Sequence, residues 1–330
     1  MNIKDFRYSV AIRTLGKAGD IYQKELDSLN NQTIRPEKIV VYLAEGYEKP
    51  KETIGCEEVV YVKKGMVAQR ALDYKEIDSP YILMLDDDVY LPKDAVEKMA
   101  TALLMESGDC IAADTFPNHQ MSAISKIKAA ISNWVLPIYS RKWAIKIQRT
   151  GSFCYNNNPT KDYYLAQSAA GPCSLWRKEA FLSIHFEDET WLDHLGFAYQ
   201  DDLLCFYKLY RNGGKMMLHY TSGVKHMDAQ SSRTAYNVDP VKFRKRARAL
   251  FLVWWRTDFD FGENSVFSKI LSLGEYIIKF LWAIVVNVAY SIATLSYKPL
   301  YYYILGNVDG YKYVYSDDYR KIKNFKITNS

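Results

Sequence analysis

The stretch Tyr81–Pro92, YILMLDDDVYLP, is the part of the sequence that decides the fold. Its first five residues carry no charge, which is typical of a parallel strand buried on both faces. Three aspartates follow at once, and in open α/β sheets ligands bind beyond the carboxyl ends of the strands. Adjacent carboxylates repel one another unless a cation lies among them. Asp86–Asp88 are therefore expected to bind a hard divalent cation, Mg²⁺ or Mn²⁺.

The chain before this stretch alternates between apolar runs and helical patterns. It predicts strands at Tyr8–Ile12, Lys38–Leu43, Glu58–Val62 and Tyr81–Leu85, and helices at Asp20–Asn30 and Val67–Ile77. Strands separated by helices indicate βαβ units. We therefore expect an α/β fold with a mixed, mostly parallel sheet flanked by helices.

Length, charge and cysteine content limit the size, the partners and the cellular setting that we expect for the protein. The 330 residues, 48% of them hydrophobic, are enough for one large α/β domain with a smaller appendage, or for two modest domains. The net charge of +5 is mild; it favours anionic partners such as lipid headgroups and does not indicate a nucleic-acid partner. Five scattered cysteines without a C-x-x-C pair, and a polar N-terminal stretch, favour a reducing, cytoplasmic setting.

Several motifs together resemble one enzyme family. The aspartate stretch resembles the D-x-D region of inverting, family 2-type glycosyltransferases with the GT-A fold. DSLNNQT at 27–33, AAGPCSLWRKEAF at 169–181 and QDDLLCFYKLYRNGG at 200–214 are similar to further motifs of that family, in the same order. The resemblance covers roughly residues 7–230. It implies transfer of a sugar from a nucleotide-sugar donor to a glycan or lipid-linked acceptor, in cell-surface polysaccharide assembly.

The resemblance also implies roles on the donor side. Arg13 and Thr14 close the first strand and would border the nucleotide. Glu45 stands after the second strand, where the family has an aspartate that reads the base. Arg70, in GMVAQRALDY, either contacts the nucleotide or is a surface arginine of a helix.

The three aspartates divide between metal and nucleotide. Side chains alternate faces along a strand, so Asp86 and Asp88 are expected to point the same way. The resemblance makes Asp88 and His226 ligands of the metal, Mn²⁺ or Mg²⁺, and turns Asp86 and Asp87 toward the nucleotide. The polar loop after His226, with Arg233, is expected to close over the diphosphate as a lid.

The catalytic residues are expected on the acceptor side of the site. The resemblance places Asp202 at the position of the catalytic base and Asp201 at the acid before it. A neighbouring acid would raise the pKa of Asp202, while Asp201 could instead cap a helix. Gly171 would allow a close backbone approach, and Trp176 is either a sugar-stacking platform or a buried core residue.

The chain divides into two expected regions. Residues 1–235 form the transferase domain, with a basic amphipathic insert at 115–161 that contains seven Lys or Arg and no Asp or Glu. That insert is either an ordinary packed helix or a surface for anionic lipid. Residues 236–330 form a basic and apolar helical region that attaches the chain to the cytoplasmic membrane face. Its uncharged stretch Phe280–Leu295 is an interfacial or re-entrant helix, a span over 277–297, or a buried helix.

One other enzyme class fits the aspartates. Leu85–Val89 also matches the D-x-D-x-[T/V] motif of haloacid-dehalogenase-type phosphatases, in which Asp86 would be the nucleophile. That family opens with this motif on its first strand. Here a strand–helix–strand section precedes it and would be left without a role.

Overall fold

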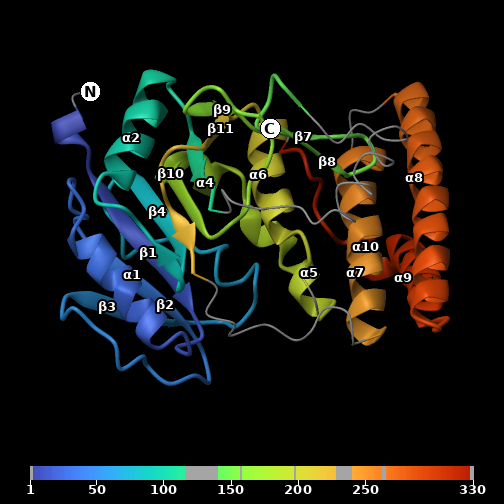
Figure 1. The fold of residues 1–330 in the computed structure, drawn as a ribbon, viewed down its shortest axis with the longest axis horizontal. Helices are drawn as coiled ribbons and strands as arrows, with labels where there is room; N and C mark the ends of the chain where they lie inside the picture. Colours follow the sequence, from blue (N-terminus) through green and yellow to red (C-terminus); the bar gives the residue numbers. More distant parts are fainter. Residues whose placement is uncertain are drawn as a thin grey trace.

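A computed structural model of the chain describes six stretches of it: residues 3–115, 140–156, 158–196, 198–227, 240–261 and 265–327. The apolar helix predicted inside the basic insert and the lid loop around Arg233 lie outside these residues. The described residues form a mixed α/β fold, as the sequence predicted, with a group of helices at one end (Figure 1).

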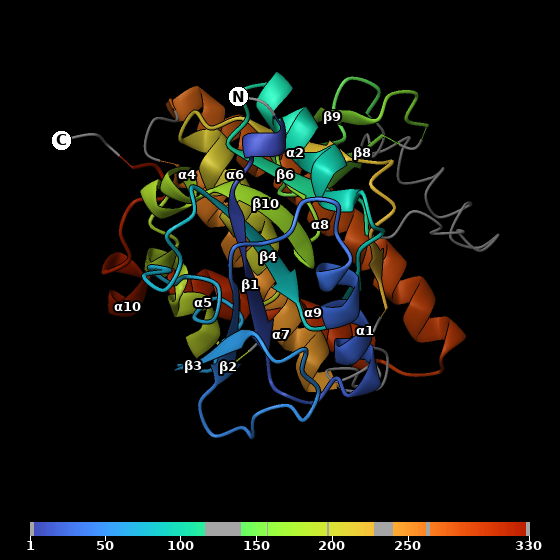
Figure 2. The same ribbon diagram turned by 90° about the vertical axis from the view of Figure 1, so that its left-hand side faces the viewer.

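An eight-stranded sheet forms the centre of the molecule, in the order β3-β2-β1-β4-β10-β6-β11-β9. Its strands are β1 (Tyr8–Thr14), β2 (Ile39–Ala44), β3 (Glu57–Val62), β4 (Tyr81–Asp86), β6 (Cys110–Ala113), β9 (Tyr163–Leu165), β10 (Cys173–Arg177) and β11 (Met216–His219). Only β9 and β10 run against the others, so the sheet is mostly parallel. Figure 2 shows β4 between β1 and β10, which places the aspartate stretch in the middle of the sheet.

Both faces of the sheet are covered, because successive strand residues enter different hydrophobic clusters. Ile12 packs with α1 (Asp20–Asn30) and α2 (Ala95–Met105) on one face. Its neighbour Ala11 belongs to the cluster of α4 (Lys178–Ser183) and α6 (Asp201–Arg211) on the other. Continuous apolar strands are the expected consequence of a sheet buried on both sides.

Short elements complete the sheet region. They are the helical turns η1 (Ile3–Asp5), η2 (Phe186–Glu189) and α5 (Trp191–His194), and two small antiparallel ladders, β5 (Val89–Tyr90) with β12 (Lys225–His226) and β7 (Ile145–Ile147) with β8 (Phe153–Tyr155). The β5–β12 ladder matters most, because it joins the aspartate stretch to His226.

The C-terminal helices lie at the end of the molecule away from β3 (Figure 1). They are α7 (Pro240–Trp254), a π-helical turn η3 (Trp255–Phe259), α8 (Val266–Ala293), α9 (Lys298–Val314) and α10 (Asp317–Arg320). Trp254 of α7 and Tyr276 of α8 belong to the same hydrophobic cluster as Phe206 of α6. The helices at this end therefore share one core with the sheet region.

Two glycines let α9 approach α7 closely. A Cβ at Gly306 would collide with the backbone of α7 at Arg244 and with Ala247, and one at Gly310 with the ring of Phe251. Small residues four apart on one helix face permit this kind of backbone contact.

Helix α8 is long and apolar and is mostly uncovered. It has 28 residues with a mean hydropathy of 1.7 over its most apolar stretch, and 6% of that stretch is buried. By length and composition it is able to cross a membrane. The interpretation of this segment as a buried core helix is therefore wrong, while a span and an interfacial helix remain as alternatives.

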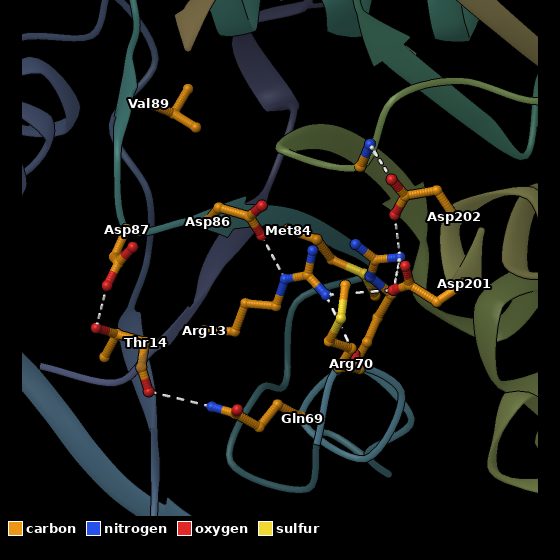
Figure 3. A network of polar contacts seen from close by, with 12 residues as sticks. Arg13, Thr14, Gln69, Arg70, Met84, Asp86, Asp87, Val89, Asp201 and Asp202 are labelled. Carbon is orange, nitrogen blue, oxygen red and sulfur yellow. Dashed lines mark hydrogen bonds and ion pairs between the residues drawn. The ribbon is translucent and has the colours of Figure 1, made fainter. Parts of the chain in front are cut away.

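The helix predicted at Val67–Ile77 is wrong, since this segment consists of turns. Asp193, far along the chain, accepts hydrogen bonds from the backbone N–H groups of Val67 (3.1 Å) and Ala68 (2.9 Å). These contacts hold the segment in a non-helical path that directs Arg70 toward the end of β4 (Figure 3). The other elements predicted before residue 90 occur with ends shifted by at most two residues, whereas the apolar helix predicted around Phe280–Leu295 begins earlier, at Val266.

Candidate active site

Arg13 and Asp86 meet because their strands are neighbours. The β1–β4 register pairs the two residues directly at the carboxyl ends of the strands. The Arg13 guanidinium donates a hydrogen bond from Nε to Oδ1 of Asp86. Its Nη1 also lies 3.7 Å from Oδ2 of Asp201, at the start of α6 (Figure 3).

Arg70 links the same strand end to the acidic pair. Its Nη1 donates to Oδ2 of Asp201 (3.1 Å) and to Oδ1 of Asp202 (2.5 Å). The side chain is 6% exposed, and its Nη2 is buried without a hydrogen-bond partner in the described part of the chain. A cavity of about 10 Å³, lined in part by Arg13, Arg70 and Gly171, has room for about one water. We call Arg13, Arg70, Asp86, Asp201 and Asp202 the strand-end cluster.

Gly171 fixes the second oxygen of Asp202. Its backbone N–H donates to Oδ2 of Asp202 at 3.0 Å. A Cβ at position 171 would collide with the Asp202 carboxylate and the Arg70 guanidinium. The expected close approach at this glycine is therefore made by a side chain of the protein itself.

The two acids of the pair differ in exposure and in the direction in which their pKa values shift. The Asp201 side chain is 4% exposed, whereas that of Asp202 is 33% exposed. Burial, with the Asp202 charge in addition, raises the pKa of Asp201 to about 6 despite Arg70 and Arg13. Burial acts on Asp202 too, but the charges of Arg70 and Arg13 and the bonds to its oxygens outweigh it and lower its pKa. The expectation that the neighbouring acid raises the pKa of Asp202 is wrong, because the raised pKa belongs to Asp201.

Asp87 has a different partner from Asp86. The hydroxyl of buried Thr14 donates to its carboxylate, and that hydroxyl also accepts the N–H of Gly16 at 2.7 Å. Burial raises the pKa of Asp87 to about 6. Gln69 holds the strand ends beneath this contact, since its Nε2 donates to the carbonyls of Thr14 (3.1 Å) and Tyr42 (3.3 Å).

Asp88 lies beside His226. Strand β4 ends at Asp86, so the strand alternation that was expected to align Asp86 with Asp88 does not extend that far. Instead the β5–β12 ladder pairs Val89 with His226 and brings Nε2 of His226 to 3.2 Å from Oδ1 of Asp88. The residue Asp88 is 8% exposed.

The donor set of Asp88 and His226 suits Mn²⁺, and a carboxylate with phosphate oxygens suits Mg²⁺. No group of three or more His, Cys, Asp or Glu gathers as a complete metal site within the ranges that the structure describes. The pair therefore fits a metal that takes its remaining ligands from a diphosphate and water.

Two predicted residues lie apart from these contacts. Glu45 follows β2 at the same edge of the sheet, but its side chain is exposed and makes no hydrogen bond or ion pair with the strand-end cluster in the described chain. Trp176 is 1% exposed and stacks on Phe206, with Nε1 donating to Ser174 at 2.9 Å. Trp176 is thus a core residue, and its interpretation as a sugar platform is wrong because neither ring face is open.

Sequence reasoning missed three supporting residues. Glu25 is fully buried and accepts the N–H of Val89 at 2.9 Å, which holds the turn after the aspartates. The sequence does carry a signal for Glu25, because it is an acid on the apolar face of the helix 20–30. Asp193 and Gln69 act through backbone contacts across the chain, and no local pattern marks them.

Lys208, the lysine within QDDLLCFYKLYRNGG, is not part of the strand-end cluster. It is fully buried, and its Nζ donates to Oε1 of Glu189 at 2.9 Å. Arg256 of the π-helical turn donates to both oxygens of the same carboxylate, at 2.6 and 2.8 Å, and Trp191 donates to Oε2 at 2.8 Å. We call Glu189, Lys208 and Arg256 the junction cluster, because it joins α6 to the C-terminal helices.

The chain is similar to known proteins in its fold and not in its sequence. Neither a protein family nor a curated protein matches the sequence. Among solved structures, S. aureus TarS is similar at 12% identity and a TM-score of 0.47, over 82% of this chain and 43% of that one. The Pyrobaculum calidifontis mannosyltransferase PcManGT, in complex with GDP-Man and Mn²⁺, is similar at 12% identity and a TM-score of 0.48, over 93% and 88%.

A third similar structure is GalNAc-T7 with UDP, GalNAc and Mn²⁺, at 13% identity and a TM-score of 0.48, over 89% of this chain and 58% of that one. The chain thus spans less than two thirds of the length of two of these three proteins.

Proposed function

We propose that the chain is a metal-dependent, inverting glycosyltransferase of the GT-A type. It transfers a sugar from a nucleotide-sugar donor to a glycan or lipid-linked acceptor, in cell-surface polysaccharide assembly. One observation carries the proposal. The contacts of Arg70 and Gly171 hold Asp202 near the carboxyl end of β4, where Asp86–Asp88 lie.

The donor half of the site consists of the strand ends. Arg13 and Thr14 face the nucleotide together with Asp86 and Asp87, whose carboxylates they hold. Glu45, at the end of β2, is proposed to border the base. These side chains come from three neighbouring parallel strands, whose carboxyl ends form one crevice.

Asp88 and His226 would hold the metal, which when bound neutralises the charge that develops on the leaving diphosphate. The β5–β12 ladder sets the distance between these two side chains. The nucleotide then leaves from the side of the sugar that faces β1 and β4.

Asp202 is the proposed catalytic base. It takes the proton of the acceptor hydroxyl while that oxygen bonds to the anomeric carbon and the bond from this carbon to the diphosphate oxygen breaks, which inverts the configuration. Its lowered pKa keeps it ionised at neutral pH, as a base must be. Arg70 and Gly171 orient the carboxylate, and buried Asp201 positions Arg70. Arg70 is thereby assigned a positioning role in addition to its expected place near the nucleotide.

The C-terminal helices are proposed to attach the chain to the cytoplasmic membrane face. The side chains of α8 that point away from the protein are large and apolar, with Val266 76% and Phe267 69% exposed. Apolar surface of this extent on a soluble protein marks an interaction site. The acceptor, if lipid-linked, would then lie at the same membrane surface.

A panel of nucleotide sugars tests the proposal. The purified chain is incubated with each donor and Mn²⁺, and thermal stability and slow donor hydrolysis are measured. One donor should raise the Tm in a metal-dependent way, because a ligand that binds only the folded state stabilises it. An unchanged Tm with every donor would contradict the transferase assignment.

No observation favours the phosphatase alternative. Its nucleophile, Asp86, accepts a hydrogen bond from Arg13, and its strand is the fourth along the chain. Hydrolysis of p-nitrophenyl phosphate that disappears in Asp86→Asn would revive that alternative.

A further inference from the structure

A basic cleft lies between α7 and α9, away from the strand-end cluster. Its volume is about 500 Å³. The charged and aromatic side chains that line it are Arg244, Lys245, Arg248, Asp309, Lys312 and Tyr313. Asp309 offsets only one of the four positive charges, so the cleft as a whole favours an anion.

Two of the four cations, Arg244 and Arg248, make hydrogen bonds within the protein. Arg244 of α7 donates to both oxygens of Asp309 of α9, at 2.5 and 2.7 Å. Arg248, one turn further along α7, donates to the carbonyl of Leu195 at 2.5 Å, while its Nε is buried without a hydrogen-bond partner among the described residues. Burial lowers the pKa of Arg248, as expected for a guanidinium whose positive charge is incompletely compensated.

The other two cations are available to a ligand. Lys245 and Lys312 line the cleft from opposite helices, and neither makes a hydrogen bond or ion pair with any residue that the structure describes. Lysine ammonium groups with flexible stems bind phosphate oxygens as point charges. Arg248 lines the same cleft, so an anion between the two lysines would lie near a third cation.

The cleft opens beside an apolar surface. Exposed apolar side chains of α9 and of its C-cap residue, Tyr315, recur three or four residues apart and form one stripe: Tyr301, Ile304, Val308, Tyr311 and Tyr315. Lys312 lies four residues after Val308 and three before Tyr315, so it stands at the border between stripe and cleft.

Helix α8 extends this apolar surface on the side of α9 away from Lys312. Tyr276 of α8 donates to Asn307 of α9 at 2.8 Å, and Phe280 stacks on Tyr303. The outward side of α8 is itself apolar, as at Ile278 (52% exposed) and Leu281 (55%). Cations beside an apolar helical surface match the boundary between headgroups and acyl chains of a membrane.

We propose that the cleft between α7 and α9 binds the phosphate of an anionic membrane lipid, with the stripe of α9 and the outer side of α8 against the acyl chains. This site rests on the proposed membrane attachment and is independent of the transfer reaction. The lipid phosphate would lie between Lys245, Lys312 and Arg248, and would set how the C-terminal helices sit on the membrane.

Vesicle binding of two matched double variants tests the site. Lys245→Gln with Lys312→Gln removes the two unpaired cations and leaves the Arg244–Asp309 bonds in place. The control, Lys24→Gln with Lys75→Gln, removes the same charge from exposed positions of the sheet region. Both are compared with the unmodified chain on phosphatidylcholine vesicles, with and without phosphatidylglycerol, by sedimentation.

All three proteins should bind neutral vesicles equally, through the apolar surface. Phosphatidylglycerol should strengthen binding of the unmodified chain and the control, whereas the Lys245/Lys312 variant should bind these vesicles roughly 30-fold more weakly. Equal binding of all three proteins to the anionic vesicles would overturn the site. Failure of the unmodified chain to bind either vesicle would overturn membrane attachment as well.

Inorganic pyrophosphate, added with EDTA, separates a lipid from a free phosphate. If pyrophosphate stabilises the unmodified chain but not the Lys245/Lys312 variant, and vesicle binding is the same for both, the cleft holds a soluble phosphate and the lipid assignment is wrong. Stabilisation of the variant by its nucleotide sugar and Mn²⁺ should be unchanged, so failure of this site and failure of the transferase proposal are distinguishable.

Discussion

The strand-end cluster and the junction cluster both contain buried charged residues, and they differ in how many of their polar atoms have hydrogen-bond partners. In the junction cluster both oxygens of Glu189 accept hydrogen bonds, the carboxylate is fully buried, and its pKa falls to about 2 because the charges of Arg256 and Lys208 outweigh burial. In the strand-end cluster one nitrogen of Arg70 has no partner among the described residues, and Asp201 has a pKa raised to about 6.

The difference in hydrogen bonding indicates that the junction cluster stabilises the fold and that the strand-end cluster serves function. A buried ion pair with all of its hydrogen bonds made holds parts of a fold together, and removal of one partner is costly. A cluster with opposed pKa shifts and a partly exposed acid is typical of a catalytic site, where some stability is given up. The comparison predicts that substitutions in the strand-end cluster change activity, whereas those in the junction cluster change stability.

The largest effect is expected from Asp202→Asn. The amide keeps the size of the side chain but takes no proton, so transfer should fall by roughly 10²- to 10⁴-fold. Donor-induced stabilisation should persist, because the donor contacts come from β1 and β4. Transfer and Tm shifts are measured with Asp78→Asn, an exposed aspartate, as the control. If donor binding is lost as well, Asp202 is structural and the comparison fails.

Glu189→Gln should have the next largest effect, and on stability alone. The variant leaves Arg256 and Lys208 buried without their carboxylate, which should lower the free energy of unfolding by about 3–5 kcal/mol. Urea denaturation measures it. Glu187→Gln, an exposed neighbour with a 57% exposed side chain, is the control and should change stability by less than about 0.5 kcal/mol. Full stability of Glu189→Gln would show that the junction cluster does not hold the fold.

Gly171→Ala should lower kcat by up to about 10²-fold, because the added Cβ displaces the Asp202 carboxylate and Arg70 from their positions. The donor affinity should change little. Gly274→Ala serves as the control, since a Cβ there meets no atom within 4 Å. A variant with normal kcat would mean that the contact between Gly171 and Asp202 does not orient the base.

The smallest effect is a pH trend for Asp201→Asn. With a folded-state pKa raised to about 6, Asp201 contributes stability below its unfolded pKa of about 4 that is lost as the pH rises through 6. Asparagine does not titrate, so the variant should gain up to about 2 kcal/mol over the unmodified chain between pH 4 and pH 8. Urea denaturation across this range checks it, and a difference that does not vary with pH would contradict the raised pKa.

Glu189 should show the opposite trend. Its lowered pKa contributes stability above its unfolded pKa of about 4.3, and this is lost as the pH falls through 2. On acidification below about pH 4.3, the stability of Glu189→Gln relative to the unmodified chain should therefore rise. That of Asp201→Asn should instead fall as the pH drops from about 6 to about 4. The same denaturation series measures both, and parallel trends would remove the distinction between the clusters.

Much of the sheet region was predictable from local pattern. The apolar runs of β2 and β4 are continuous because both faces of the sheet are covered, so their period and length indicated buried strands directly. The end of β4 was marked by a change from apolar residues to Asp86–Asp88. The acidic pair forms the first two residues of α6, but Gln200 is the N-cap, so the interpretation of Asp201 as a helix cap is wrong.

The segment around Arg70 was not predictable in this way. Its sequence is compatible with a helix, but Asp193 binds two of its N–H groups and the chain turns instead. Trp176 was likewise ambiguous, since a large aromatic residue suits a sugar platform and a core equally well. Its neighbours, Phe206 of α6 among them, decide the matter, and they lie far away in the sequence.

The sequence by itself determined which segments form strands and helices, where the acids stand on them, and that an apolar helix follows near the C-terminus. Only the tertiary structure decided which acid meets which base elsewhere: Asp86 with Arg13, Asp202 with Arg70, and Glu189 with Arg256. The physical reason is that periodicity along the chain reports burial, a local property. Strand register and packing set the distances between side chains, and these join residues that are remote along the chain.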